Sequence, residues 1–415
     1  MLRVLLLASL SASCASPRAV PSLNTIAEQY VKLVLAVGVH DPAYVDMYYG
    51  PFEWLRTASD EHTSIPVIRE RAVELLDLLH KQPKQKEDTA RVRFLEAQVA
   101  SLIHRADLLA GAHLSFDDES RGLFGITAPP FAESSASVAV AELDRRLPGA
   151  GPVAARLEAY SRRMAVPDDR LRTTVETALA ACRARTAAHL SLPAGERIEV
   201  AYVHDQPWSA YATYAGGFRT RIEINVDLPR RPDQILDLMC HEGYPGHHTQ
   251  YSLLEQRMVR ARGWQEFQVL PLLSPASAWS EAAATAGVAV AFDAEDRRSF
   301  ERDVLFPVAG ISASEVERMS AVRRLTAELA PAGTEAARRY LDGRLTRADA
   351  VLWLERYAAM PRPQELLGFV DQFRSYVVGY TAGAADVRRE IDRSPQADPA
   401  ARWRAFERVI LHKCL

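Results

Sequence analysis

The segment HEGYPGHH at residues 241–248 constrains this 415-residue chain more than any other part of its sequence. It places three imidazoles and one carboxylate within eight residues. Neutral imidazoles are common ligands of a hydrolytic zinc ion, and a nearby carboxylate can take a proton from water. The segment therefore predicts a metal-dependent hydrolytic site. The alternative interpretation is a capped helix end that happens to be rich in polar groups.

The spacing of these histidines differs from the familiar pattern, in which two ligands stand four residues apart on one helical face. His247 lies six residues after His241, and His248 lies seven after it. On a regular helix His248 would be about 10.5 Å along the axis, too far for two bonds of roughly 2.0–2.1 Å to one zinc. Pro245 cannot donate to the carbonyl of His241, and Gly246 can adopt backbone angles closed to other residues. We therefore expect the helix to end or bulge there, which would return His247 to the metal.

The segment resembles the hallmark of the Domain of Unknown Function 885 family, HExYPGHH, and looser similarity runs from about residue 20 to the C-terminus. That family resembles the helical gluzincin peptidases. By this resemblance His241 and His247 are zinc ligands, Glu242 is the general base and His248 is a neighbour of the site. The resemblance implies one zinc ion per chain, and manganese or cobalt would suit the same donors.

A second segment, WSEAAATAG at 279–287, falls where the family has an acidic segment on a helix. The resemblance implies that Glu281 is the third metal ligand. The Gly and Trp that normally follow this glutamate are Ala282 and Ala283 here. This departure concerns the substrate pocket more than the metal. Without the resemblance, Glu281 is equally a candidate for a structural ion pair.

A third segment, RSYVVGYTAG at 374–383, resembles the closing segment of the family. The resemblance implies that Tyr380 stabilises the oxyanion of the reaction, with Tyr376 and Arg374 as second choices because the usual Pro and Gln are absent. The alternative role for Tyr380 is that of a packed aromatic side chain with a bonded hydroxyl.

Residues 197–228 are rich in β-branched and aromatic side chains with local alternation, which predicts two or three strands with a turn at Gly216–Gly217. Pro232 then opens the helix that runs into His241. The strand RIEINVDLP at 221–229 resembles the one that leads into the metal helix of the family. In related peptidases the edge of such a strand binds substrate backbone by strand addition.

Apolar residues recur at helical spacing through most of the remaining chain. We expect a short helix at 115–125 capped by Ser115 or Asp117, and helix breaks at Pro and Gly, including Pro331–Gly333. The expected fold is mainly α, a helical gluzincin-like metallopeptidase fold with a small β-sheet beside the metal helix. It should form one domain over 21–415, with one or two lobes and a cleft that admits short peptides.

Composition excludes several classes of partner. The chain is 48% hydrophobic and 25% charged, and its net charge of −3 arises from interleaved acidic and basic residues. Such a pattern is typical of a solvated surface around a core, so we expect no nucleic-acid partner. After the N-terminus the sequence contains no stretch that is long and apolar enough to span a bilayer.

The first residues, MLRVLLLASLSASCAS, have the order of a secretory signal peptide, which predicts that residues 1–20 are removed on export to the periplasm or beyond. Lipidation at Cys14 and a cytoplasmic protein with a flexible tail are the alternatives. The other cysteines, Cys182, Cys240 and Cys414, show no close spacing. We expect structural thiols and no disulfide framework.

These features together predict zinc-dependent hydrolysis of peptide bonds, of the oligopeptidase or carboxypeptidase type, by metal-activated water with a Glu general base. One alternative is a zinc hydrolase of non-peptide amides or esters. The other is a non-catalytic binding protein that retains the fold, which Ala282 and Ala283 motivate. The isolated histidines outside 241–248 receive no role, and His204 is the one to examine.

Overall fold

The computed structural model describes residues 21–83, 88–206, 209–393 and 398–411. The molecule is mainly helical, with a small three-stranded sheet beside the helix that carries His241, which confirms the predicted fold class. The predicted signal peptide and Cys14 lie outside the described residues. The extent of a single domain over 21–415 stays a prediction.

The elements follow the chain in a simple order. The first half contains α1 (Leu23–His40), β1 (Val45–Tyr48), α2 (Phe52–Glu61), α3 (Ile65–His80), α4 (Thr89–Leu109), α5 (Phe116–Phe124), α6 (Glu133–Arg146), α7 (Val153–Arg163), α8 (Asp168–Ala187), β2 (Arg197–Val203), β3 (Ala210–Tyr214) and β4 (Arg219–Asn225). The second half contains α9 (Pro232–Glu242), α10 (His247–Leu254), β5 (Val269–Pro271), α11 (Pro275–Ala291), α12 (Ala294–Phe300), α13 (Phe306–Ala309), α14 (Val316–Leu341), α15 (Arg347–Ala358), α16 (Pro363–Phe373), α17 (Ala384–Asp392) and α18 (Pro399–Ile410). Short 3₁₀ or π turns are η1 (Glu255–Arg260), η2 (Gln265–Gln268), η3 (Glu301–Leu305), η4 (Ala313–Glu315), η5 (Arg374–Val377) and η6 (Gly379–Gly383).

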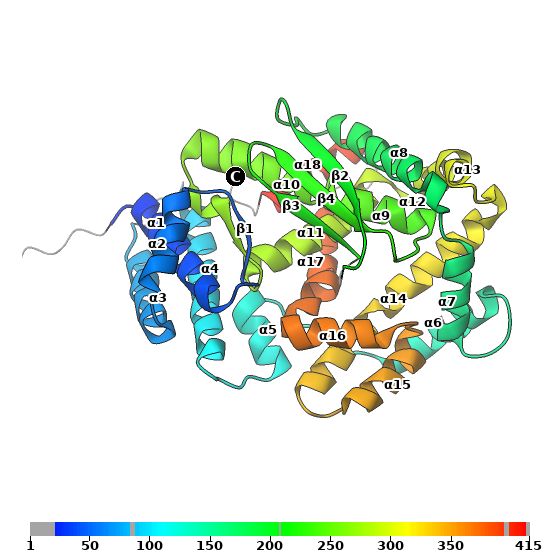
Figure 1. The fold of residues 1–415 in the computed structure, drawn as a ribbon, viewed down its shortest axis with the longest axis horizontal. Coiled ribbons are helices and arrows are strands. Elements are labelled where there is room, and N and C mark those ends of the chain that lie inside the picture. Colours follow the sequence, from blue (N-terminus) through cyan, green and yellow to red (C-terminus); the bar gives the residue numbers. More distant parts are fainter. Residues whose placement is uncertain (1–20, 84–87, 207–208, 394–397, 412–415) are drawn as a thin grey trace, which may run out of the picture.

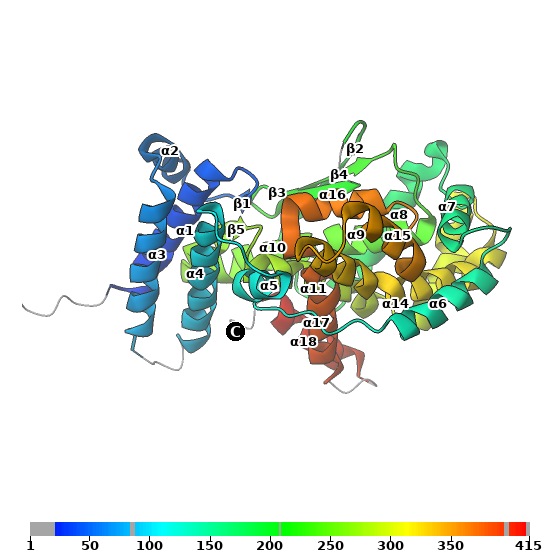
Figure 2. The same ribbon diagram turned by 90° about the horizontal axis from the view of Figure 1, so that it is seen from below.

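Helices α1 to α4 stand side by side at one end of the molecule (Figures 1 and 2). They pack through the apolar faces that the helical spacing predicted. Ser22 caps α1 by accepting a hydrogen bond from the amide of Thr25 at 3.2 Å. Ser115 caps α5 in the same way through Asp118, also at 3.2 Å, so Ser115 and not Asp117 is the cap.

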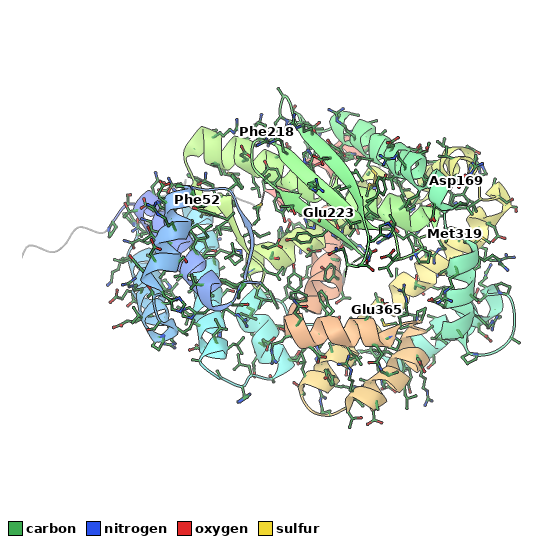
Figure 3. The ribbon with its side chains drawn as sticks, in the orientation of Figure 1. Phe52, Asp169, Phe218, Glu223, Met319 and Glu365 are labelled. Atoms are coloured by element: carbon green, nitrogen blue, oxygen red, sulfur yellow. A yellow bond between two sulfur atoms is a disulfide. The ribbon has the colours of Figure 1, made fainter. Side chains whose placement is uncertain are left out.

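The three-stranded sheet has the order β2-β4-β3, with β2 parallel and β3 antiparallel to β4. Gly216 and Gly217 form the predicted turn with φ of 71° and 65°, a region that favours glycine. Figure 3 labels Phe218 at this turn and Glu223 on β4. Because β4 pairs on both sides, the expectation that its edge is free for strand addition is wrong. The edge strands of the sheet are β2 and β3.

Strand β1 contradicts the expectation of a wholly helical N-terminal part. Residues Val45–Tyr48 pair antiparallel with β5, which follows more than 200 residues later. The pairing supplies the backbone hydrogen bonds that make this segment a strand, and such a long-range partner leaves no local pattern. The two strands join the N-terminal helices to the segment that leads into α11.

Pro331 does not break its helix as predicted but lies inside α14. Its ring removes the donor to the carbonyl of Ala327, a residue that is exposed, so water can satisfy that carbonyl. Ala332 and Ala336 are fully buried in a cluster with α15, and this packing continues the helix beyond the proline.

Helix α11 lies at the centre of the molecule, between two large hydrophobic clusters (Figure 1). Its Ala278 belongs to the cluster built mainly by α1, α3 and α4. One turn later Ala282 belongs to the cluster built by α8, α9, α14 and the sheet. Glu281 therefore lies where the two clusters meet. Among the described residues no helix is long and apolar enough to cross a membrane.

Cys182 and Cys240 form a disulfide, which corrects the expectation of free structural thiols. They are separated by 58 residues, and their Cα atoms lie 5.6 Å apart. The bond ties α8 to the last turn of α9. The spacing in the sequence could not reveal this pair because α8 and α9 are brought together only by the fold.

Candidate metal centre

The chain breaks the metal helix at the predicted place. Helix α9 ends at Glu242 and α10 begins at His247. The amide of Gly246 donates to the carbonyl of Cys240 at 3.0 Å, which fixes the loop between the helices. A Cβ atom on Gly246 would lie only 1.8 Å from the carbonyl oxygen of His241. Only glycine fits this close approach, which lets α10 start with His247 beside His241.

His241, His247 and Glu281 come together at this break. The Nε2 atom of His241 lies 3.2 Å from Oε2 of Glu281, and Nε2 of His247 lies 3.5 Å from its Oε1. The two imidazole rings are perpendicular, with centroids 4.8 Å apart. One ligand atom from each residue falls within 4.8 Å of the others. Three helices, α9, α10 and α11, thus direct donor atoms to one point.

This arrangement fits a metal ion by donor type and by spacing. With bonds of roughly 2.0–2.1 Å, ligand atoms around a tetrahedral zinc lie about 3.3 Å apart. The two separations above, 3.2 and 3.5 Å, bracket that value. Two imidazoles and one carboxylate leave a further position for water and substrate. The same donors would also suit manganese or cobalt.

A chain of hydrogen bonds orients His247. Gln250 donates to the carbonyl of Ile410 at 3.2 Å, so its amide oxygen accepts from Ser280 at 2.6 Å. The Ser280 oxygen lies 3.1 Å from Nδ1 of His247 and accepts its proton. Tyr251 bonds the same serine at 3.0 Å and stacks on His247. The Nε2 lone pair of His247 is thereby left for the cluster.

The charges of the cluster shift the pKa values of its members. Burial alone would lower the pKa of His247, but the Glu281 carboxylate, with Glu242 and Asp46, raises it to about 9. Burial alone would raise the pKa of Glu281, but His247 and His241 hold it well below its usual range. A metal ion would replace the proton that these three carboxylates otherwise favour on His247.

Glu242 is the last residue of α9 and is partly buried. Its charge acts on His247, Tyr380 and Tyr211. Within the described part of the chain, no lysine or arginine forms an ion pair with Glu242. Glu242 thus adjoins His241 in the chain, and the ion pairs of the described residues give it no partner of opposite charge.

Two tyrosines reach the cluster from the C-terminal segment. The hydroxyl of Tyr376 bonds Ser277 at 2.6 Å and donates to Oε1 of Glu281 at 3.4 Å. Tyr380 packs against Tyr376 edge to face, and 39% of its surface is exposed. Burial, and then the charges of Glu281 and Glu242, raise the pKa of Tyr380 well above its ordinary value. Its hydroxyl therefore stays protonated and can donate.

Arg374, a second choice from the sequence, does not contact the cluster through any contact that the structure describes. Its Nε donates to Glu119 at 2.6 Å, and Ser375 donates to the same carboxylate from its amide at 3.1 Å and its hydroxyl at 2.6 Å. Glu119 is fully buried, and Arg374 adopts a φ of 52°. This clamp holds the turn that carries Tyr376.

Comparison with known proteins finds two solved structures of low sequence identity among its matches. No protein-family model and no curated protein matches the chain. A candidate lipoprotein from Colwellia psychrerythraea aligns with a TM-score of 0.47 and 14% identity, over 85% of this chain and 70% of its own. An M32 carboxypeptidase from Deinococcus radiodurans R1 aligns with a TM-score of 0.47 and 16% identity, over 94% of this chain and 88% of its own.

His248 lies outside the cluster and belongs to a second buried network. Its Nδ1 lies 2.7 Å from the hydroxyl of Thr220, and its Nε2 lies 2.9 Å from Oε2 of Glu196. Tyr244 donates to the same carboxylate, which also pairs with Arg183 at 2.6 Å. Burial alone would raise the pKa of Glu196, but these donors lower it to about 2. Two residues of HEGYPGHH thus anchor the segment to the start of the sheet.

Sequence reasoning missed Glu196, Asp46 and Tyr211. Each lies far along the chain from the motif, and no spacing links them to it. His204, which the sequence marked for examination, forms an exposed pair with Asp227 at 2.7 Å. The hydrogen bond that Asp227 accepts from the His204 ring raises the pKa of His204. This pair sits beyond the end of β4 and contributes no atom to the cluster.

Proposed function

We propose that this chain is a zinc-dependent hydrolase of peptide bonds, of the oligopeptidase or carboxypeptidase type. The convergence of His241, His247 and Glu281 is the observation that carries the proposal. The support that Ser280 gives to His247 adds to it, because a hydrogen bond on the distal nitrogen is usual for a histidine that binds a metal. The resemblance of HEGYPGHH to the Domain of Unknown Function 885 family and to gluzincins points in the same direction.

In the proposed reaction Glu242 moves the protons. Its carboxylate lies next to His241 in the chain, and its charge acts on His247. It accepts a proton from the attacking water and delivers that proton to the leaving amine, so the amide bond breaks without release of a strong base. Zinc, when bound, supplies a Lewis acid that polarises the carbonyl and makes water a better nucleophile.

Tyr380 is the donor we assign to the developing oxyanion. Its hydroxyl is protonated, partly exposed and close to the charges of Glu281 and Glu242. The Tyr376 hydroxyl is already engaged by Ser277 and Glu281, which suits a supporting role. Tyr380→Phe should therefore lower turnover more than metal affinity.

The two alternatives of a non-catalytic protein and of a different substrate receive no specific observation in their favour. Ala282 and Ala283, whose identity motivated the first, are both fully buried within the packing of α11. Their side chains serve the core, so the loss of Gly and Trp at these positions leaves the arrangement of the three candidate ligands intact.

The proposal includes export. The disulfide between Cys182 and Cys240 suits an oxidising compartment, since cytosolic thiols are kept reduced. The order of residues at the N-terminus is that of a secretory signal. N-terminal sequencing of the protein from an exporting host, with and without Cys14→Ala, tests removal of the first 20 residues and lipidation together.

The experiment that tests the proposed function is metal analysis joined to peptide cleavage. Purified wild type should hold one zinc per chain and cleave short peptides. His241→Ala and Glu281→Ala should lose the zinc, whereas Glu242→Gln should keep it and lose turnover. A wild type that neither retains nor takes up zinc contradicts the proposal. Zinc binding with no cleavage of any peptide would instead favour the non-catalytic alternative.

A further inference from the structure

Asp46 occupies an unusual position in the short strand β1. The register pairs Val45 with Pro271 and Met47 with Leu270, so Asp46 is an extra residue without a partner on β5. This is a β-bulge, a feature that re-aims a side chain and that occurs often beside active sites. The strand β5 leads within a few residues into α11, which carries Glu281. The bulge therefore lies on the segment that approaches the metal cluster.

One hydrogen bond holds the Asp46 carboxylate toward the sheet. The hydroxyl of Tyr211, on strand β3, donates to Oδ1 of Asp46 at 2.9 Å. Tyr211 is 38% exposed and Asp46 is partly buried, so the pair lies at a surface that solvent reaches. Because β3 is an edge strand of the sheet, this pair connects that edge with strand β1.

The electrostatic surroundings of Asp46 are those of the cluster. Glu281, His247 and Glu242 are the charged groups that act on it most strongly. Its own charge in turn acts on Tyr211, Tyr251, Tyr376 and Tyr380. Asp46 is thus coupled electrostatically to the cluster, although it is not among the three residues whose donor atoms converge.

The cluster and its surroundings carry an excess of negative charge. A zinc ion with Glu281 would leave one positive charge, which Glu242 and Asp46 together exceed. In the part of the chain that the structure describes, no lysine or arginine forms an ion pair with Asp46. Burial and the neighbouring carboxylates raise the pKa of Asp46, because they disfavour its ionised form. A cation beside Asp46 would favour the ionised form and be attracted to it. A structural carboxylate would normally have such a partner within the protein.

We propose that Asp46 is a specificity residue that receives a positively charged group of the peptide substrate, either its α-ammonium or a lysine or arginine side chain. This inference rests on the proposed function.

The test uses the zinc-loaded full chain and four matched pentapeptides of one sequence. Two of the peptides carry a free amino terminus and two are N-acetylated. Within each of these two pairs, one peptide has lysine at a chosen position and the other has its neutral isostere norleucine there. Cleavage is followed by mass spectrometry to obtain kcat and KM separately. Wild type should cleave a cationic peptide with a kcat/KM about tenfold or more above that of its neutral counterpart, as expected for one close pair of opposite charges. A preference for the free over the acetylated peptides shows that the α-ammonium is recognised. A preference for lysine over norleucine shows that the side chain is recognised.

Asp46→Asn is the decisive variant because the amide has the same shape and can still accept from Tyr211. The preference for the cationic peptide should fall to about onefold, mainly through a higher KM for that peptide. The neutral peptide, measured on both proteins at known zinc content, corrects for any change in basal turnover. Asp46→Glu should restore part of the preference. Asp227→Asn removes one charge from an exposed pair outside the cluster and should keep the full preference.

The results separate failure of this inference from failure of the proposed function. Cleavage with the same peptide preference in wild type and Asp46→Asn overturns the inference and leaves the hydrolase intact. If wild type cleaves none of the peptides, the proposed function fails, and calorimetric binding of the same peptides to wild type and Asp46→Asn decides the inference. Tighter binding of a cationic peptide that Asp46→Asn abolishes supports it, whereas equal affinities or no binding overturn it.

Discussion

His241 and Glu281 are separated by 40 residues, whereas Tyr376 follows Glu281 by another 95. The ligand side of the candidate centre consists of α9, α10 and α11, and Gln250 of α10 ties it to the carbonyl of Ile410 in α18. The tyrosine side, η5 and η6, is held by Glu119 from 255 residues earlier in the chain. The three candidate ligands come from one stretch of 41 residues, whereas the tyrosine side depends on an anchor in the first half of the chain. Metal binding and turnover should therefore respond to different substitutions.

The largest effect is expected on the ligand side. His247→Ala removes one of the three converging donors and should weaken zinc binding by more than the roughly 10–100-fold that the loss of a supporting residue costs. Zinc affinity measured by competition with a chelator checks this. His204→Ala, a change of the same kind in the exposed pair with Asp227, should leave affinity unchanged. Retention of wild-type affinity in His247→Ala would remove this histidine from the ligand set.

Glu196→Gln tests the anchor of HEGYPGHH. The pKa of Glu196 is lowered from 4.5 to about 2, so its stabilising contribution is fully present above about pH 4.5 and disappears as the pH falls to about 2. The shift corresponds to about 3 kcal/mol of unfolding free energy at neutral pH. Denaturant unfolding of both proteins should show a difference that shrinks across this range. Glu199→Gln, an exposed control on β2, should show almost none; equal losses in the two variants would contradict the prediction.

Two serines on α11 compare the two sides directly. Ser280 supports His247, whereas Ser277, one turn earlier, bonds Tyr376. Ser280→Ala should lower zinc affinity by about 10–100-fold. Ser277→Ala should leave zinc affinity close to wild type and lower kcat instead. A reversed pattern, with zinc affinity more sensitive to Ser277→Ala, would mean that the two sides are not independent.

Glu119→Gln should have the smallest effect. The amide still accepts from Ser375, but the charge opposite Arg374 is lost, and we expect about 1–2 kcal/mol less stability. Turnover should fall because η5 and Tyr376 are held less firmly, while zinc affinity stays within about twofold. Glu133→Gln, which removes an exposed partner of Arg339, is the control. A parallel fall of zinc affinity and turnover in Glu119→Gln would show that the clamp also supports the ligands.

The local constraints of the chain could be predicted from its sequence. Pro245 and Gly246 indicated the break in the metal helix, and the structure shows why glycine is required at the second position. Gly216–Gly217 form a turn and Ser115 caps a helix, and each of these roles involves only residues nearby in the sequence. Such residues determine backbone geometry without help from distant segments, so their effect can be recognised before the fold is known.

The constraints that the sequence did not reveal all depend on distant partners. Strand β1 exists because β5 lies beside it, and the disulfide exists because α8 and α9 pack together. Pro331 remains inside a helix because α15 packs on the residues that follow it. The place of Glu196 at the motif, and of Glu119 at the tyrosines, follows from contacts that no spacing encodes. The catalytic roles of Glu242 and Tyr380 stay predictions.

The bulge in β1 also affects how easily this protein can evolve. Because Asp46 has no partner in the register with β5, replacing its side chain alters no pairing between the two strands. The charge of Asp46 interacts with the charges of the cluster, yet Asp46 is not one of the three residues whose donor atoms converge. Position 46 is thus a point at which descendants of this chain could acquire a different substrate charge preference by a single codon change, without loss of a strand pairing or of a converging donor.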